Sequence, residues 1–343
     1  MPKYVVRRPV RNRTAAHLGA AILVMNLVMN LAGPAAFAGA VNPVPARDPF
    51  AIPDALDSRP DVSTDNLFGF TDGTDSNSEG EREASLDLIT RFGKRAVTLD
   101  DGTPGGKGRF TVLGVQGAVQ YGVTDAFNVE IGVFGDLRRV KNVPGFDDKS
   151  AANFNGASAQ FKYRLLERTP DNPVGVAVSI EPRWARIADQ EGVREDTFSA
   201  ETRLMLDARV VPGLLWWGVN IGFEPQAGRY HRGGGERQSN FTVSNALSTR
   251  LLGESKLGIG TYVGLEASYQ RAYAGLFAQQ LGGEAAFVGP TLYHQFSKTA
   301  YVSAAWSTQV WGRQRNPAPL TTHKLDLWNF ERHLARLKIG FNF

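Results

Sequence analysis

The sequence has no cysteine among its 343 residues. Disulfide bonds, thiolate metal sites and cysteine nucleophiles are therefore excluded. Histidine is scarce, with five residues, and no long hydrophobic run follows the first 38 residues. A membrane-spanning helix needs about 20 apolar residues in succession. If the rest of the chain enters a membrane, it must therefore do so with strands.

Acidic residues are missing from residues 1–38, where an apolar stretch from Leu18 to Ala32 precedes the small-x-small pattern Ala36-Phe37-Ala38. The basic residues before that stretch are Lys3, Arg7, Arg8, Arg11 and Arg13. These features predict a cleaved secretory signal peptide over 1–38 rather than a retained transmembrane helix. Without these five, the 38 basic residues of the chain become 33, against 34 acidic ones. The mature chain is then near neutral, so we expect no nucleic-acid partner.

From residue 82 onward, apolar and polar residues alternate with a period of two, as in Phe127–Val133 and Ala335–Phe343. This alternation places the apolar side chains on one face of extended strands. The tenth predicted strand is the weakest because Pro290 lies inside it. The twelve predicted strands are 82–99, 108–121, 126–138, 153–167, 174–187, 195–210, 214–229, 238–252, 257–270, 284–296, 300–311 and 328–343.

The connections between these strands are alternately short and longer. Gly122–Asp125 and Val211–Gly213 are tight, whereas Arg139–Ala152 and Gly312–Leu327 are long. Outer-membrane barrels have this asymmetry of short periplasmic turns and longer external loops. The predicted strands also exceed the usual five to six residues of soluble proteins, which disfavours a secreted β-sandwich. We predict an all-β fold, a transmembrane antiparallel up-and-down β-barrel of about 12 strands over 82–343, counted to within two strands.

Aromatic residues recur where the predicted strands meet the short turns. An outer-membrane barrel places aromatic girdles facing lipid at both interfaces. We therefore predict a girdle at the turn end that comprises Tyr121, Phe127, Trp216, Trp217, Phe296, Tyr301 and Phe343.

The C-terminal run Leu337–Phe343, which ends in phenylalanine, resembles the assembly signal of Gram-negative outer-membrane barrels. Residues 121–125, Tyr-Gly-Val-Thr-Asp, resemble their periplasmic turn. The run 68–73 and the turn 168–173 are similar to uncharacterised proteobacterial transporter-like barrels associated with phenol-degradation pathways. The resemblance implies the outer membrane of a Gram-negative bacterium, contact with its lipid, and recognition by the barrel-assembly machinery through the C-terminal strand, with Phe341 and Phe343 in the signal. It assigns no functional residues.

Residues 39–81 have no sustained periodicity; they begin proline-rich and continue through an acidic, Gly/Ser-rich run. This composition predicts an irregular N-terminal arm. The arm either hangs free in the periplasm or folds into the barrel as a plug. Phe68 and Phe70 favour the plug, whereas the proline and acid content favours the free arm.

Motifs for catalysis, cofactors and metals are incomplete. The glycine-rich run 102–108 resembles a phosphate loop, but Asp101 stands where the first glycine is needed and Gly108 where Ser/Thr is needed. A calcium loop starting at Asp75 would have Leu86 in place of its bidentate glutamate. We expect no enzyme activity, no catalytic residues, no cofactor and no metal. An outer-membrane lipid hydrolase, the least favoured alternative, would need a serine beside His294 or His333.

The polar faces of the strands carry many charges and would line the lumen. We expect a monomeric channel for small polar or charged solutes; the alternative is a sealed barrel of cross-strand ion pairs with a structural or surface-interaction role. A barrel of about eight strands is filled by its side chains and one of sixteen or more encloses an open channel. A barrel of about 12 strands lies between these sizes, so the strand number does not decide between the channel and the sealed barrel. The predicted pore-lining residues are Glu130, Lys162, Arg164, Glu181, Arg183, Glu201, Arg203, Asp207, Arg209, Glu224, Glu266, Arg336 and Lys338.

Overall fold

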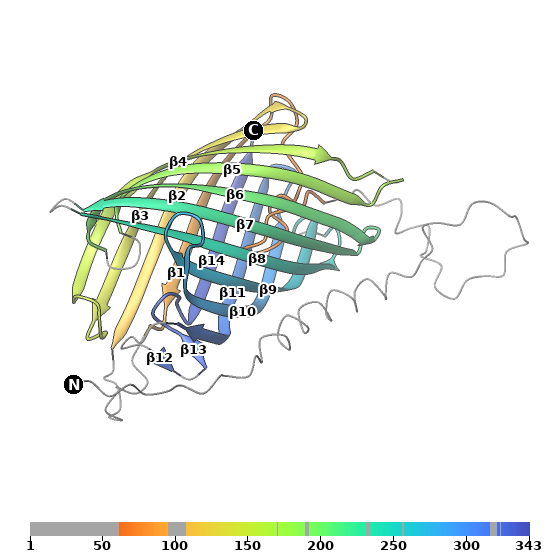
Figure 1. The fold of residues 1–343 in the computed structure, drawn as a ribbon. Helices are drawn as coiled ribbons and strands as arrows, with labels where there is room; N and C mark the ends of the chain where they lie inside the picture. The colour runs from red at the N-terminus through yellow and green to blue at the C-terminus, as the bar shows by residue number, and fades with distance from the viewer. Residues whose placement is uncertain are drawn as a thin grey trace, which may run out of the picture. The chain divides into compact units, whose positions relative to one another are not determined.

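The computed structural model describes residues 62–94, 108–169, 171–188, 192–230, 234–255, 257–315, 321–322 and 324–343. Twelve strands form a closed antiparallel barrel in which every strand pairs with its neighbours along the chain and β14 pairs with β1 (Figure 1). The predicted fold class and strand number are therefore confirmed. The predicted signal peptide and the start of the predicted arm, up to residue 61, lie outside the described residues.

The described strands agree in order with the predicted ones, and a separate two-stranded sheet, β12 with β13, lies in the last long connection. In that part of the chain which the structure describes, no helix is long and apolar enough to cross a membrane. The strands are β1 (Arg82–Phe92), β2 (Arg109–Thr124), β3 (Phe127–Lys141), β4 (Lys149–Leu166), β5 (Val174–Ile187), β6 (Arg194–Val211), β7 (Leu215–Tyr230), β8 (Gly235–Leu252), β9 (Gly260–Ala274), β10 (Gln280–Gln295), β11 (Ala300–Gln314), β12 (Thr321–Thr322), β13 (Leu325–Asp326) and β14 (His333–Asn342).

The first and last barrel strands are shorter than predicted. Strand β1 ends before Gly93, whose φ of 90° leaves the extended region that strands require. Strand β14 begins at His333 rather than at residue 328, because Asp326 accepts hydrogen bonds from the backbone N–H groups of Trp328 and Asn329. An aspartate that bonds the backbone two and three residues ahead of it forms a turn.

Pro290 lies within β10, and the ladder adjusts to it. Pairing of β10 with β11 stops at Val288 and resumes at Thr291, so Gly289 and Pro290 have no partner on that side. Proline has no N–H to donate, so a ladder can pass it only where one bond is missing. The tenth predicted strand is thus a complete barrel strand.

Apolar side chains lie on the outside of the barrel and polar ones on the inside. Ile131 and Leu265 are more than 60% exposed, whereas Lys162 and Asp207 are buried. A soluble protein would have the opposite arrangement. Of the predicted girdle, Tyr121, Phe296 and Phe343 are exposed.

The predicted girdle is wrong at Trp216 and Tyr301, because both side chains are buried on the inner face of the barrel. Trp216 and its neighbour Trp217 are consecutive residues of one strand, and successive side chains of a strand point to opposite faces. Only one tryptophan of the pair can therefore face outward, and it is Trp217 that does so.

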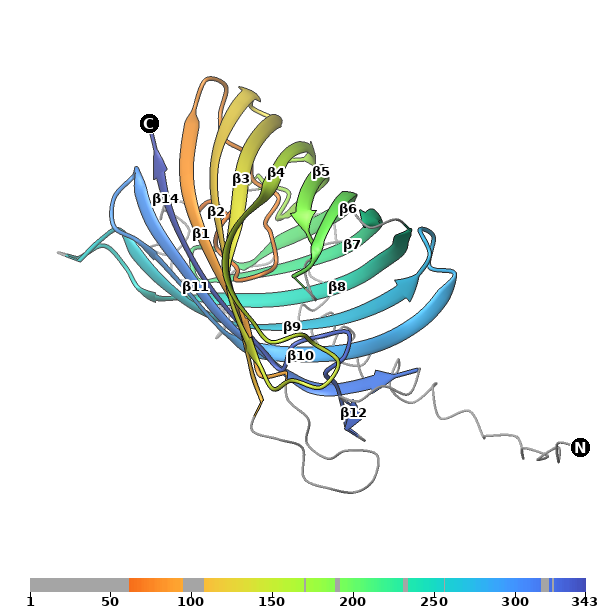
Figure 2. The same cartoon turned by 90° about the vertical axis from the view of Figure 1, so that its left-hand side faces the viewer.

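Residues 62–81, which we call the inner segment, run inside the barrel before β1 (Figure 2). The backbone N–H of Phe70 donates to Glu266 on β9 at 2.7 Å, and that of Thr74 donates to Asp207 on β6 at 2.7 Å. Both acceptors lie on inward-facing positions of distant strands. The inner segment therefore contacts the barrel from within.

Candidate functional site: the lumen

The inner segment is held at the turn end by a cluster of Arg168, Asp75, Asp207 and Thr64, which we call the latch. Arg168, in the turn after β4, donates to both Asp75 and Asp207. Asp75 also accepts from the backbone N–H of Thr64 at 2.8 Å, and the hydroxyl of Thr64 donates to Asp207. Burial alone would lower the pKa of Arg168, but the two carboxylates raise it above its ordinary value. The latch therefore joins a turn, a strand and the inner segment through paired charges.

Two lysines of the lumen also bind the inner segment. The ammonium group of Lys162 on β4 donates to Asp65 and to the carbonyl oxygens of Gly73 and Asp75, the latter two at 2.8 and 2.6 Å. An ammonium group has three donors, so all of them are used. Lys338 on β14 donates to the side-chain oxygen of Asn66 at 2.7 Å.

Two arginines of the lumen complete the charged contacts. Arg203 on β6 pairs with Glu201 and with Asp72 of the inner segment. Arg336 on β14 donates to Asp87 at 2.9 Å and to the carbonyl oxygen of Gly69 at 2.7 Å. Burial would raise the pKa of the Asp72 carboxyl, but Arg203, Arg336 and the two lumen lysines hold it below its ordinary value. The acidic inner segment is thus complementary to the basic residues of the lumen.

An aromatic cluster occupies the other side of the lumen near the turn end. Phe68 of the inner segment is buried against Gly218 of β7, where a Cβ atom would lie 2.7 Å from its ring. Tyr301 in this cluster donates to Glu83 on β1 at 2.5 Å. The cluster closes this side of the lumen with apolar surface. Its buried members are Val62, Leu67, Phe68, Trp216, Ala246, Tyr262, Tyr293 and Tyr301.

A cavity of about 200 Å³ lies between the inner segment and strands β1–β6 and β14. Its walls are mostly polar, and Phe70 and Asp72 of the inner segment form part of them. Seven of the predicted pore-lining residues line this cavity: Glu130, Lys162, Glu181, Arg183, Arg203, Arg336 and Lys338.

The other predicted pore-lining residues have different positions. Arg164 and Arg209 lie at the turn end, where they donate to the carbonyl oxygens of Asp125 and Thr169 at 2.8 and 3.1 Å. These two arginines hold turns rather than line the cavity. The remaining four are Glu201, which bonds Arg203; Asp207, in the latch; Glu266, which accepts from Phe70; and Glu224, which faces inward on β7 opposite Asn240.

Several lumen residues were not identified from the sequence. Asp65, Asp72 and Asp75 belong to a coil whose acids have no spacing that relates them to basic residues on strands, and Arg168 lies in a turn. The near balance of acidic and basic residues after residue 38 is consistent with paired charges, but it does not say which pairs form.

The two histidines in barrel strands hydrogen-bond to threonine. His294 Nδ1 lies 2.9 Å from the hydroxyl of Thr261, and His333 Nδ1 lies 3.1 Å from that of Thr308. His333 also stacks on Phe92. Within the described ranges, no group of three or more His, Asp or Glu side chains is arranged to hold a metal ion.

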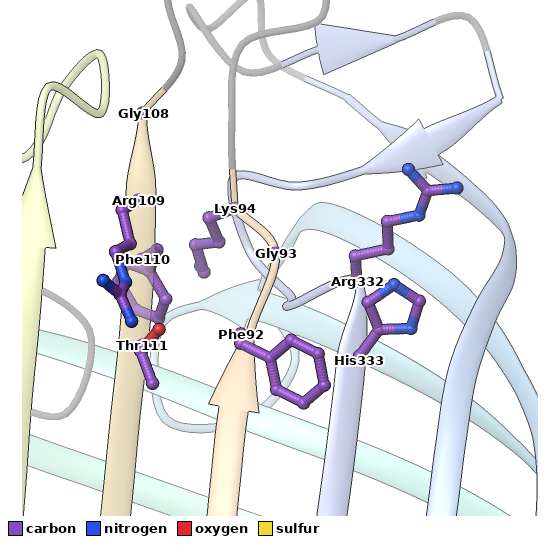
Figure 3. Close-up of a pocket in the computed structure, with 9 residues that line it drawn as sticks. All are labelled: Phe92, Gly93, Lys94, Gly108, Arg109, Phe110, Thr111, Arg332 and His333. Carbon is purple, nitrogen blue, oxygen red and sulfur yellow. The ribbon is translucent and has the colours of Figure 1, made fainter.

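A second cavity, of about 340 Å³, lies at the loop end between β1, β2 and the start of β14 (Figure 3). Lys94 beside it is buried, donates to the carbonyl oxygen of Trp328 at 2.7 Å, and lies over the rings of Phe110 and Phe146. None of the predicted pore-lining residues lines this cavity. Its lining residues are Phe92, Gly93, Lys94, Gly108, Arg109, Phe110, Thr111, Arg332 and His333.

Comparisons with known proteins agree with the barrel architecture. A family profile, described as one of unknown function, matches residues 60–343. The crystal structure of the COG4313 outer membrane channel from Pseudomonas putida F1 is similar, with 11% identity, a TM-score of 0.51, and coverage of 79% of this chain and 98% of that one. At this identity the likeness concerns the fold, which is that of an outer-membrane barrel.

Two further solved structures match with lower scores. The NanC porin has 8% identity and a TM-score of 0.43, with coverage of 75% of this chain and 98% of that one. The translocator domain of the autotransporter NalP from Neisseria meningitidis has 10% identity and a TM-score of 0.40, with coverage of 79% and 91%. No curated protein matches the sequence.

Proposed function

We propose that this chain, which belongs to the family of unknown function DUF6662, is an outer-membrane channel for small polar or charged solutes. The apolar outer face suits lipid, and the charged inner face suits water and solutes. We place the protein in the outer membrane of a Gram-negative bacterium as a monomer, since a closed barrel has no free sheet edge.

The observation that carries this proposal is the polar cavity beside the inner segment. A sealed barrel of ion pairs would leave no lumen charge without a partner. Glu130 lines the cavity and has no hydrogen bond or ion pair within 4.0 Å to any residue that the structure describes. A carboxylate without a hydrogen-bond donor in an enclosed interior is costly unless water or a solute supplies one. This side chain therefore favours a wet, open lumen.

In this proposal the inner segment is a plug that narrows the channel. It covers the lumen beside β7–β11 with the aromatic cluster and leaves the polar cavity beside β1–β6. Solutes would pass on the polar side. The size of the remaining cavity favours small solutes over large ones.

The C-terminal strand supports the assembly role that its resemblance implies. Phe341 and Phe343 are both exposed on the outside of the barrel. Side chains in this position are accessible to an assembly machinery while β14 pairs with β1 and β11.

Single-channel recording in planar bilayers tests the proposed function. Protein is extracted from outer membranes and shown to be folded by its heat-dependent shift on gels. We expect small discrete current steps. Continuous silence from folded protein would contradict the channel and support the sealed barrel.

A further inference from the structure

A single row of inward-facing side chains crosses eight neighbouring strands, β1 to β8, and every member is Glu, Gln or Asn. We call it the carbonyl row. Strand pairing places Glu83 opposite Gln120, Gln120 opposite Glu130, Glu130 opposite Gln160, Glu181 opposite Glu201, and Glu224 opposite Asn240. The pairs Phe161–Ile180 and Thr202–Phe223 continue the same register from Gln160 to Glu181 and from Glu201 to Glu224.

The carbonyl row climbs from the turn end of the barrel toward the loop end. Strands β1, β3, β5 and β7 all begin at the turn end. Glu83 is the second residue of β1, Glu130 the fourth of β3, Glu181 the eighth of β5 and Glu224 the tenth of β7. Measured from the turn-end start of each strand, the row moves eight residues between β1 and β7, which is roughly 25 Å at about 3.3 Å per residue. It therefore follows the direction in which a solute would cross the lumen.

The adjacent inward row on the loop side consists mainly of small residues. It runs through Ser85, Ala118, Gly132 and Ser158, then Arg183 and Ser199. Small side chains leave space beside the carbonyl row, and Ser85 and Ala118 line the cavity together with Glu130 and Glu181. Ser158 is only 7% exposed and has no hydrogen-bond partner among the described residues. A hydroxyl without a protein partner is free to bind water or a solute.

The basic side chains near this space bind the inner segment, whereas two carboxylates of the cavity accept no hydrogen bond from a described residue. Lys162 and Arg203 bind Asp65 and Asp72 of the inner segment. Glu181 is 8% exposed, makes no hydrogen bond to a described residue, and has only the Nε atom of Arg183 at 4.0 Å.

Arg183 itself lies over the ring of Phe134. Of the acids that line the cavity, Glu130 and Glu181 accept no hydrogen bond from a described residue; Lys338 attracts the first and Arg183 lies near the second. The inner segment thus binds Lys162 and Arg203 and leaves the carboxylates of Glu130 and Glu181 without a hydrogen-bond donor from the described residues.

We propose that the carbonyl row is the solute path and that it selects small organic cations carrying a primary ammonium or guanidinium group. This inference rests on the proposed channel function and names its substrate class. Directly opposed residues of neighbouring strands lie about 5 Å apart, so an N–H donor can pass from one oxygen to the next. Hydrogen bonds from such cations to carboxylates are stronger than neutral ones. The row offers oxygens in single file, and no three metal-ligand groups converge within the described residues.

The test is ion selectivity in planar bilayers at pH 8, with protein extracted from outer membranes. A potassium chloride gradient gives the preference for cations, and putrescine, a primary diamine, serves as the organic probe. The variant is Glu130→Gln with Glu181→Gln and Glu224→Gln, which removes charge at nearly constant shape. The matched control is Glu167→Gln with Glu236→Gln and Glu254→Gln, three exposed glutamates in a turn, at a strand start and in another turn.

We expect the unmodified channel to prefer potassium over chloride severalfold and to be blocked by putrescine. In the lumen variant the permeability ratio should fall to about 1 and the block should weaken, whereas the control should behave as the unmodified channel. Glu181→Gln alone, checked for folding by its heat-dependent shift, gives an intermediate ratio. Anion preference in the unmodified channel, or cation preference retained in the lumen variant, would overturn the carbonyl row as the path. Those results would overturn the selectivity but not the proposed channel function, which would be contradicted by an absence of current steps from folded protein.

Discussion

Individual acids and bases of the lumen are paired across long stretches of sequence. Asp207 is fully buried on β6 and accepts hydrogen bonds from Arg168, from the hydroxyl of Thr64 and from the backbone of Thr74. Its charge is compensated only while the inner segment and the turn after β4 are both in place. Removing one partner of a buried pair leaves the other charge uncompensated.

Asp207→Asn is expected to lower the free energy of unfolding by about 3 kcal/mol or more, because Arg168 loses one of its two carboxylates inside the barrel. The inner segment should also become accessible to protease. Urea unfolding in detergent and limited proteolysis measure the two effects. Asp171→Asn, an exposed position in the turn after β4, is the control. Equal stability of the two variants would contradict the latch.

Asp72 makes docking of the inner segment depend on pH. The pKa of its carboxyl is lowered below the ordinary 3.8 because nearby cations outweigh the effect of burial. A group with a lowered pKa in the folded state stabilises that state above its unfolded pKa, and this stability is lost as the pH falls through the folded value.

Hydrogen-exchange protection of residues 62–81 should therefore persist down to about pH 4 and fall below it. Asp72→Asn should reduce protection at neutral pH and flatten the pH dependence. Protection that is lost well above pH 5 in the unmodified chain would show that the ion pairs of Asp72 do not hold the segment.

Among the elements, the inner segment and β5 lie close together at Thr74 and Gly175. A Cβ atom at Gly175 would lie 3.2 Å from that of Thr74, near the range of about 3.5–4.5 Å found in disulfides. Since the chain has no cysteine, an engineered pair would have no competing thiol.

Thr74→Cys with Gly175→Cys is expected to lock the inner segment to the barrel when oxidised. If the segment moves during conduction, oxidation should lower the open probability and a reducing agent should restore it. Single-channel recording before and after reduction measures this. Each single substitution alone is the control. Identical currents in both redox states of the bridged protein would indicate that the plug stays in place during conduction.

For the whole molecule, closure of the barrel depends on its two end strands. Strand β14 pairs with both β1 and β11, and the backbone N–H of Phe343 donates to the carbonyl oxygen of Arg82 at 2.9 Å. The side chain of Phe343 is 68% exposed on the outside. The last residue therefore completes the backbone ladder and presents an aromatic ring to its surroundings.

Deletion of Phe343 is expected to lower the amount of assembled protein in the outer membrane severalfold, because the C-terminal aromatic residue is lost. Quantitative gels of heat-modifiable protein in membrane fractions measure the loss. Phe277→Ala, an exposed aromatic in the connection between β9 and β10, controls for loss of apolar surface. Normal levels of the shortened chain would contradict an assembly role for Phe343.

Local sequence patterns were sufficient to identify the barrel. Alternation with a period of two depends only on neighbours along the chain, so it predicts strands, the number of strands and the division into two faces. Turn lengths are equally local, and they distinguished the two ends of the barrel. Errors arose where a local pattern ended: Gly93 and Asp326 shorten the end strands, and both act through backbone geometry or hydrogen bonds that alternation does not record.

The tertiary structure decided which side chains meet. The acid content of the arm favoured a free arm in the sequence analysis, and only the pairing of its acids with Lys162, Arg203 and Arg168 places residues 62–81 in the lumen. The carbonyl row likewise depends on the register of eight strands, and register relates residues far apart in the chain. Spacing along one strand contains no information about its offset from the next, so alternation predicts the faces of the barrel while the contacts across its lumen follow only from closure of the sheet.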